Sequence, residues 1–300
     1  MKPAAAIENF FSAATDRILA RWPRRAAAAR RLATAALVSH RGEHDNRRVF
    51  ENTLAAFDRA AAAGVWGLEL DVRWSADRQP VVFHDPDLRR LAANPMRLCQ
   101  ATLSRLRAVF APLATLAEVV ARYGGRCHLM IEIKSEVYPD PPVQSAILAQ
   151  VLSPLRPAAD YHLMSLDPAM FRHLGFVPRR CLVPIAWGGV AAFSRLALER
   201  GYGGVAGHFG LVGRRCLERH HRHGQQVGCG MVDSPRGVYR EVDRGVDWIF
   251  SNRAAPLARI CGARRRRNDP HTHDAPVSGR DVFRGPRSCR SSTEGKSDGH

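Results

Sequence analysis

The sequence lacks any uninterrupted apolar run close to the roughly 20 residues that a membrane-spanning helix needs. Its N-terminus also lacks a compact apolar stretch followed by a small-residue cleavage site, which a secretory signal would require. The seven cysteines are widely scattered and form neither a Cys-x-x-Cys pair nor a Cys/His pattern at zinc-finger spacing. We therefore expect a cytoplasmic protein with free thiols.

Lysine is scarce, because only Lys2, Lys134 and Lys296 occur among 45 basic residues. The net charge of +17 is concentrated at the two ends of the chain. Residues 1–36 carry seven basic and two acidic side chains, and residues 262–300 carry nine and five, so these ends contribute +5 and +4. Aromatic residues do not alternate with the basic ones, and nucleic acid is not an expected partner.

Composition divides the chain into three parts. Residues 1–35 are expected to form an amphipathic helix and a basic linker, with Ile7, Phe10 and Ile18 on the apolar face. A peripheral membrane contact through this helix is the alternative to packing against the domain that follows. Residues 36–261 are expected to form one domain, and residues 262–300 a disordered basic tail that is too polar to bury a core. No obligatory protein partner is evident.

Short β-like runs alternate with helical patterns throughout the central part. Strands are expected at residues 36–39, 67–72, 80–83, 128–133, 162–165, 182–186, 203–206, 227–232 and 246–250. Helices are expected at residues 53–63, 114–123, 143–152, 168–174, 191–201, 214–223 and 235–244. The alternation predicts an α/β fold, a TIM (β/α)₈ barrel. Nine strands compete for eight places, and the connector 73–79 is too short for a crossover helix.

Polar side chains accompany four of the expected strands. They are His40 and Arg41, Glu69 and Asp71, His84, and Glu132 and Lys134. Two residues separated by one position on a strand share a face, which places the Glu69 and Asp71 carboxylates about 7 Å apart. Several carboxylates in a barrel lumen repel one another unless a cation lies between them. Oxygen ligands favour Mg²⁺, Mn²⁺ or Ca²⁺ over zinc.

Two imidazoles, an arginine and a carboxylate-bound cation are the groups that phosphodiester cleavage requires. One imidazole removes a proton from the attacking oxygen, and the other protonates the leaving alkoxide. The cation and Arg41 neutralise the phosphoryl oxygens. His40 and His84 are the two candidates, and either can fill either role.

The sequence resembles the glycerophosphodiester phosphodiesterase family over about residues 37–257. The matching segments are His40-Arg41-Gly42, Glu51-Asn52-Thr53-Leu54, Glu69-Leu70-Asp71-Val72, Val81 to Asp85, Glu132-Ile133-Lys134, Ser165 to Pro168, and Gly245 to Asn252. The resemblance implies a TIM barrel that hydrolyses glycerophosphodiesters to sn-glycerol 3-phosphate and an alcohol. It implies that His40 and His84 are the acid and base, that Glu69, Asp71 and Glu132 bind the metal, and that Arg41 and Lys134 hold phosphate.

Two departures from the family concern the substrate. Phe50 stands where the family commonly has proline, and Gly230-Met231 replaces a tryptophan-threonine pair at the barrel mouth. A larger alcohol pocket favours an alternative substrate, a lysophospholipid cleaved in the manner of a phospholipase D at a membrane surface. The non-enzymatic alternative is a catalytically retired barrel that binds a phosphorylated ligand.

Two further expectations concern residues outside the catalytic set. Asn52 and Thr53 are both expected to cap the helix that follows them. His220, His221 and His223 lie at the end of a basic helix and are expected to be exposed rather than to bind a metal.

Overall fold

The computed structural model describes residue 27 and residues 29–261. Most of the predicted N-terminal helix and linker, and the whole predicted tail of 262–300, lie outside the described residues. The described chain begins with Ala27 and a short helix α2, Ala29–Ala33. None of the helices in residues 29–261 is both long and apolar enough to cross a membrane.

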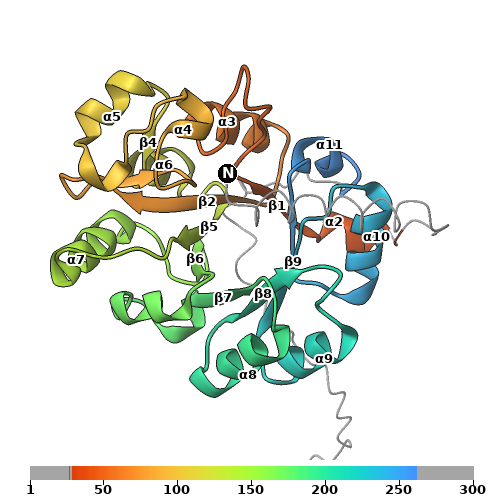
Figure 1. Ribbon diagram of the computed structural model, residues 1–300. Coiled ribbons are helices and arrows are strands. Elements are labelled where there is room, and N and C mark those ends of the chain that lie inside the picture. The colour runs from red at the N-terminus through yellow and green to blue at the C-terminus, as the bar shows by residue number, and fades with distance from the viewer. Residues whose placement is uncertain (1–26, 28, 262–300) are drawn as a thin grey trace, which may run out of the picture. The chain divides into compact units, whose positions relative to one another are not determined.

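Eight parallel strands form a closed barrel (Figure 1). They are β1 Ala36–His40, β2 Gly67–Trp74, β5 His128–Ile133, β6 Tyr161–Ser165, β7 Leu182–Ala186, β8 Gly204–His208, β9 Gln226–Gly230 and β10 Trp248–Ser251. The barrel closes because β1 pairs with β10 on one side and with β2 on the other. This arrangement confirms the predicted TIM barrel.

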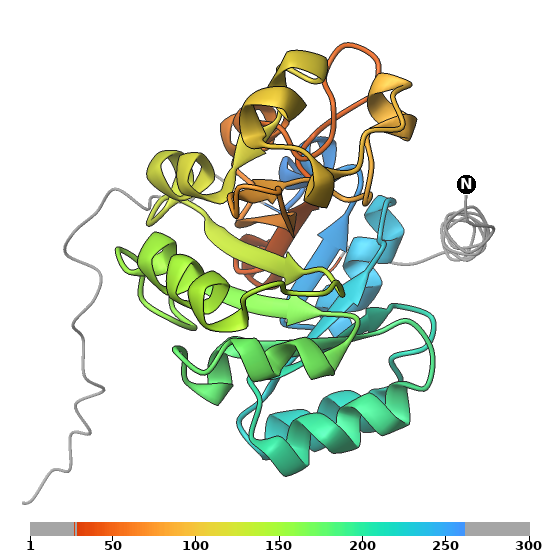
Figure 2. The same cartoon turned by 60° about the vertical axis from the view of Figure 1, so that its left-hand side comes forward.

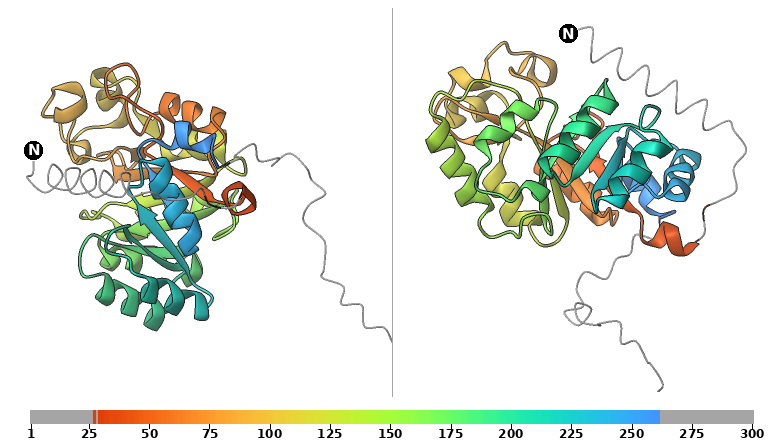
Figure 3. Two further views of the ribbon diagram at one scale, coloured as in Figure 1. Left: turned by 90° about the vertical axis from the view of Figure 1, so that its right-hand side faces the viewer. Right: turned by 90° about the horizontal axis from the view of Figure 1, so that it is seen from below.

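Helices surround the strands in Figure 1 and cover their outer faces. They are α3 Leu54–Ala62, α6 Leu116–Tyr123, α7 Pro141–Leu152, α8 Val190–Arg200, α9 Arg214–Arg222, α10 Pro235–Arg244 and α11 Ala254–Ala258. Between β6 and β7 the chain forms only the 3₁₀ helices η2, Pro168–His173, and η3, Arg179–Cys181. Helices α8 and α9 pack side by side, as Figure 3 shows.

The strand expected at residues 80–83 forms, but it is the one of the nine candidates that has no place in the barrel. Strand β3, Pro80–Val82, pairs antiparallel with β2 and lies outside the parallel barrel. Only five residues separate the two strands, and a connection that short can form a hairpin but not a parallel crossover. A two-residue strand β4, Ala114–Thr115, extends this edge, so helix α6 begins at Leu116 rather than at residue 114.

The chain between β3 and β4 forms a compact excursion on the barrel. It contains α4 Arg89–Ala92, η1 Leu98–Gln100 and α5 Leu103–Val109, which lie together at the top of Figure 2. Phe83, Leu88, Leu106 and Phe110 belong to a hydrophobic cluster distinct from the main core. Phe50 packs edge-on against Phe110, with ring centroids 5.4 Å apart, and thereby ties the loop after β1 to this excursion.

Apolar layers fill the lumen below the carboxyl ends of the parallel strands. Val38, Met130, Met164, Trp248 and Phe250 form one cluster within the ring of strands. Val38 and Met130 each lie two positions before a predicted site residue, His40 and Glu132 respectively, and so share its face of the strand. The barrel interior is therefore a packed core with polar groups above it, rather than a channel.

Helix starts follow the local sequence. Thr115 and Glu118 form a reciprocal capping box at α6, and the Thr53 hydroxyl accepts from the amide of Ala56 at α3. Ser234 caps α10, where Pro235 occupies the first turn and has no N–H group that would need a partner. The expectation for Thr53 is confirmed.

A substitution at Gly204 tests how closely the strands β8 and β9 approach each other. A Cβ atom on Gly204 would lie 1.8 Å from the Gln226 carbonyl oxygen, so Gly204→Ala is expected to destabilise the fold by about 1–3 kcal/mol. Gly175→Ala is the control, because no atom lies within 4 Å of its added Cβ. Denaturant unfolding measures both variants, and equal midpoints would contradict the close approach.

Candidate active site

The barrel brings the predicted polar residues to one end. His40 is the last residue of β1 and lies in register with Glu69 of β2. Asp71 of β2 lies in register with Glu132 of β5, and Lys134 follows β5 directly. The carboxyl ends of parallel strands meet at the same rim, which is where TIM barrels carry their reactive groups.

Glu69, Asp71 and Glu132 form a buried acidic triad. Each offers an oxygen, and these atoms all lie within 4.8 Å of one another. Burial and the neighbouring Asp71 charge raise the pKa of Glu69 well above its usual range. Asp71 pairs with Arg41 and Lys134, and Glu132 pairs with Lys134, whereas Glu69 accepts only from the Arg41 backbone amide among these groups, so a charge on Glu69 would be uncompensated. The donor set and its charge both fit a divalent cation with oxygen ligands.

Lys134 and Arg41 supply the positive charges of the cluster. The Lys134 Nζ lies 2.6 Å from an Asp71 oxygen and 2.7 Å from a Glu132 oxygen. The Arg41 Nε lies 3.1 Å from the other Asp71 oxygen. Burial opposes ionisation of Asp71, but Lys134 and Arg41 outweigh it and hold the pKa of Asp71 well below its usual range. Asp71 is thus an anion with a cation on each oxygen.

The backbone of Arg41 is also part of the site. Its amide donates to the Glu69 carbonyl and to the Glu69 Oε2, both at 3.0 Å. Arg41 has a φ of +57°, a conformation that non-glycine residues rarely adopt. This conformation turns the chain sharply after β1, and the Arg41 side chain reaches Glu51 at 3.1 Å.

Asn52 is a site residue that sequence reasoning missed. It does not cap α3, since its side chain contacts Asp71 instead: Nδ2 donates to Oδ2 at 2.7 Å, and Oδ1 accepts from the Asp71 amide at 3.3 Å. The φ of Asn52 is +58°, which asparagine tolerates better than most residues. The neighbouring Thr53 takes the cap, so adjacent residues of one motif have different roles.

The β2–β3 hairpin brings His84 to the site. The Phe83 amide donates to the Asp71 carbonyl at 2.9 Å, and His84 follows immediately. The His84 Nδ1 lies 2.7 Å from the Asp85 Oδ1, and the charges of Asp71 and Arg41 both act on its ring. Burial is the largest influence and lowers the pKa of His84. His84 therefore reaches the rim by a hairpin return rather than by a barrel strand.

Arg90 joins two parts of the site in a way that the sequence did not indicate. Its guanidinium makes two hydrogen bonds to Glu51, at 2.9 and 2.6 Å, and a third to Asp85 at 2.6 Å. Burial opposes ionisation of Glu51, yet Arg90 and Arg41 hold its pKa below the usual value. A continuous network thus runs from Arg41 through Glu51, Arg90 and Asp85 to His84.

His40 has a neutral partner. Its Nδ1 lies 2.7 Å from the Asn252 Oδ1, and its Nε2 lies 3.7 Å from Glu69 Oε2. Burial and the adjacent Arg41 charge lower the pKa of His40 to about 3. The two histidines thus differ in environment, because one has an amide partner and the other a carboxylate.

The expectation that His220, His221 and His223, at the end of helix α9, are all exposed is wrong for His220. The His220 ring is buried, with Nε2 2.9 Å from the Ser194 hydroxyl and Nδ1 2.7 Å from the Gln225 side-chain oxygen. It joins α9 to α8 and to the loop before β9. His221 and His223 are exposed.

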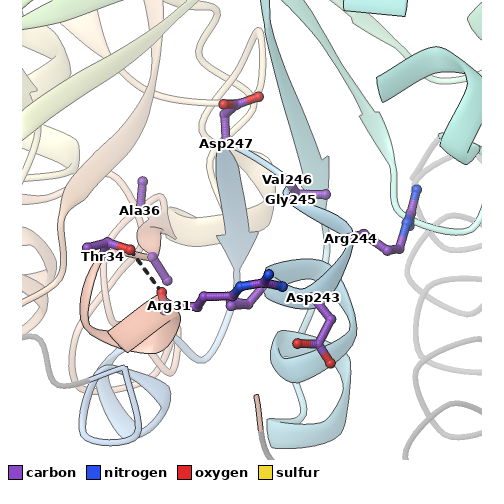
Figure 4. Close-up of a pocket in the computed structure, with 10 residues that line it drawn as sticks. Arg31, Thr34, Ala36, Asp243, Arg244, Gly245, Val246 and Asp247 are labelled. Atoms are coloured by element: carbon purple, nitrogen blue, oxygen red, sulfur yellow. Dashed lines mark hydrogen bonds between the residues drawn. The ribbon is translucent and has the colours of Figure 1, made fainter. Parts of the chain in front are cut away.

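A separate pocket of about 470 Å³ opens at the other end of the barrel (Figure 4). Ala36 at the start of β1, Gly245 and Asp247 before β10, and Arg31 of α2 contribute to its lining. It contains none of the seven predicted site residues. In TIM barrels, polar groups at this end more often serve stability than catalysis.

Comparison with known proteins agrees with this geometry. The chain matches the Glycerophosphoryl diester phosphodiesterase family over residues 40–255. It belongs to this family. A glycerophosphodiester phosphodiesterase of Caldanaerobacter subterraneus is 32% identical over 127 residues, which cover 38% of this chain and 51% of that protein. Bovine glycerophosphodiester phosphodiesterase 1 is 42% identical over 71 residues, 23% of this chain and 20% of that protein. The matches span about half, or less, of these curated relatives.

Solved structures share the fold. A glycerophosphodiester phosphodiesterase from Thermotoga maritima has a TM-score of 0.63 at 23% identity, covering 75% of this chain and 98% of that one. An Oleispira antarctica phosphodiesterase in complex with the product sn-glycerol-3-phosphate has a TM-score of 0.64 at 20% identity, covering 76% and 96%. At these identities the likeness establishes the barrel alone.

Asn52→Gly is expected to weaken divalent-cation binding by about 10- to 100-fold, because the amide that orients Asp71 is lost. Glycine keeps the positive φ, so the change removes the side chain without backbone strain. Calorimetric titration with Mn²⁺ measures the affinity. Asn46→Gly is the control, since Asn46 also has a positive φ but contacts Glu51 rather than the triad. Equal affinities in both variants would contradict the role given to Asn52.

Proposed function

We propose that this protein is a metal-dependent phosphodiesterase that hydrolyses glycerophosphodiesters to sn-glycerol 3-phosphate and an alcohol. The single observation that carries the proposal is the convergence of two histidines, an acidic triad and two cationic side chains on one barrel rim. Membership of the family supports the reaction class. The product found in the Oleispira antarctica relative supports a small-molecule phosphate ester as substrate.

The two histidines are given different roles. His40 is the general base, since its Nδ1 is held by an amide oxygen while its Nε2 lies near the triad without a hydrogen bond. His84 is the general acid that protonates the leaving alkoxide, since the Asp85 carboxylate stabilises the protonated ring. His40 thus takes up a proton from the attacking oxygen, and His84 gives a proton to the leaving oxygen.

The charged groups bind the phosphodiester. Arg41 and Lys134 are the phosphate ligands, with ion pairs to Asp71 that hold both side chains beside the triad. Glu69, Asp71 and Glu132 are the residues that would hold Mg²⁺ or Ca²⁺, with Mn²⁺ as a third candidate. When bound, the cation supplies positive charge against the phosphoryl oxygens.

The direct test is release of glycerol 3-phosphate from glycerophosphocholine or glycerophosphoethanolamine by the full chain. Activity is expected with Mg²⁺, Ca²⁺ or Mn²⁺ and is expected to disappear in EDTA, because the uncompensated triad then lacks its cation. The proposal would be contradicted if neither substrate were hydrolysed with any of the three metals. Turnover would exclude the retired phosphate-binding barrel.

A pair of variants tests the two histidine roles. With an alkyl leaving group, His84→Asn is expected to lose about 100-fold or more in rate, but with an aryl leaving group it should retain activity, because a phenolate departs without a proton. His40→Asn should lose activity on both substrates. If His40→Asn instead kept its activity on the aryl substrate and His84→Asn lost activity on both, His40 would be the acid and His84 the base.

A second candidate substrate, a lysophospholipid, is favoured by the distribution of exposed apolar side chains. Within residue 27 and residues 29–261, four of the five exposed large hydrophobic residues follow the carboxyl end of one of the strands β5 to β8, and the fifth, Val143, lies in α7. Leu166, Trp187 and Leu211 follow three successive strands and are 39%, 43% and 47% exposed. Exposed apolar side chains thus follow the strands that come after the charged cluster in the barrel order, which suits a phosphodiester with an acyl chain.

Trp187→Ser separates the two substrates. The variant is expected to raise KM for lysophosphatidylcholine about tenfold, because the indole no longer buries part of the acyl chain. Glycerophosphocholine, which has no acyl chain, is the matched control and should keep its KM. Equal changes of KM for both substrates would contradict the proposed contact between Trp187 and the acyl chain. Membrane contact through residues 1–35 and a cytoplasmic location stay predictions.

A further inference from the structure

A chain of hydrogen bonds reaches His40 from the neighbouring strands. Asp233 follows β9, Asn252 follows β10, and His40 ends β1. The Asn252 Nδ2 donates to Asp233 Oδ2 at 3.1 Å, and the Asn252 backbone amide donates to Asp233 Oδ1 at 2.8 Å. The Asn252 Oδ1 then meets the His40 Nδ1 at 2.7 Å. Three successive strands of the barrel are thus linked at their carboxyl ends.

The carboxylate decides which way the Asn252 amide points. An ionised carboxylate only accepts hydrogen bonds, so the amide must turn its NH₂ group toward Asp233 and its oxygen toward His40. The Ser251 hydroxyl donates to the same carboxylate at 2.9 Å, and this contact fixes Asp233 in turn. A flipped Asn252 would place its oxygen against a carboxylate oxygen and lose a hydrogen bond.

We propose that Asp233 is a positioning residue that acts through Asn252 to select the tautomer of His40. The amide oxygen can only accept, so the neutral ring must carry its hydrogen on Nδ1. The Nε2 lone pair is then free on the side of the acidic triad, where Nε2 lies 3.7 Å from Glu69 Oε2. This inference rests on the proposed role of His40 as the general base.

The arrangement at His84 is different in kind. There the Asp85 carboxylate contacts the ring nitrogen directly, at 2.7 Å. At His40 the carboxylate is one residue further away, and a neutral amide stands between it and the ring. Asp233 therefore determines the position of the His40 hydrogen without placing a formal charge next to the imidazole.

The ¹⁵N NMR spectrum of the histidine side chains tests the inference without substrate. In the unsubstituted full chain at neutral pH, His40 is expected to be the Nδ1–H tautomer, with its signals assigned by comparison with His40→Asn. Asp233→Asn removes the charge that orients Asn252, so a mixture of tautomers is expected, with kcat about 10- to 100-fold lower and KM little changed.

Asp247→Asn is the matched control. The Asp247 carboxylate also accepts from a histidine, His221 at 2.8 Å, but it precedes β10 and lies at the opposite end of the strand from Asn252. Its loss should leave the His40 signals and kcat unchanged. An Nε2–H tautomer in the unsubstituted protein, or an unaltered tautomer in Asp233→Asn, would overturn the inference. A correct tautomer without turnover of glycerophosphodiesters would count against the proposed function alone.

Discussion

Repulsion among three buried carboxylates is the constraint on which the rest of the site depends. Glu69, Asp71 and Glu132 converge because they lie on one face of the adjacent strands β2 and β5. Burial makes their charges costly, and the surrounding structure compensates. Lys134 and Arg41 neutralise Asp71 from two sides, while Asn52 fixes its orientation. The charge that remains is what makes the site suitable for a divalent cation.

The same compensation extends outward to the histidines. Arg41 shares Glu51 with Arg90, and Arg90 in turn holds Asp85 against His84. The excursion between β3 and β4 is therefore joined to the polar end of the barrel by the ion pairs of Arg90. His40 is supported from the other side of the barrel by Asn252, which follows β10. The two histidines thus depend on different parts of the chain.

Sequence patterns predicted the barrel well because strand and helix periodicity are local properties. They did not show which of the nine candidate strands lies outside the barrel, because the apolar run at 80–83 has the same appearance whether it pairs in parallel or antiparallel fashion. The helix caps also show that a local pattern does not reveal contacts with distant residues. Asn52 and Thr53 are both good capping residues, and only the position of Asp71 shows that Asn52 bonds elsewhere. His220 belongs to a basic helix, yet its ring lies against Ser194 and Gln225.

The sequence by itself determined the order of strands and helices and the seven polar residues that accompany four expected strands. It did so because alternation along a strand decides which side chains share a face. Only the tertiary structure decided the partners: Asn52 for Asp71, Arg90 between Glu51 and Asp85, and Asn252 for His40. These contacts join residues 19, 39 and 212 positions apart. Their geometry depends on barrel closure and on the hairpin of β2 and β3, which no local pattern contains.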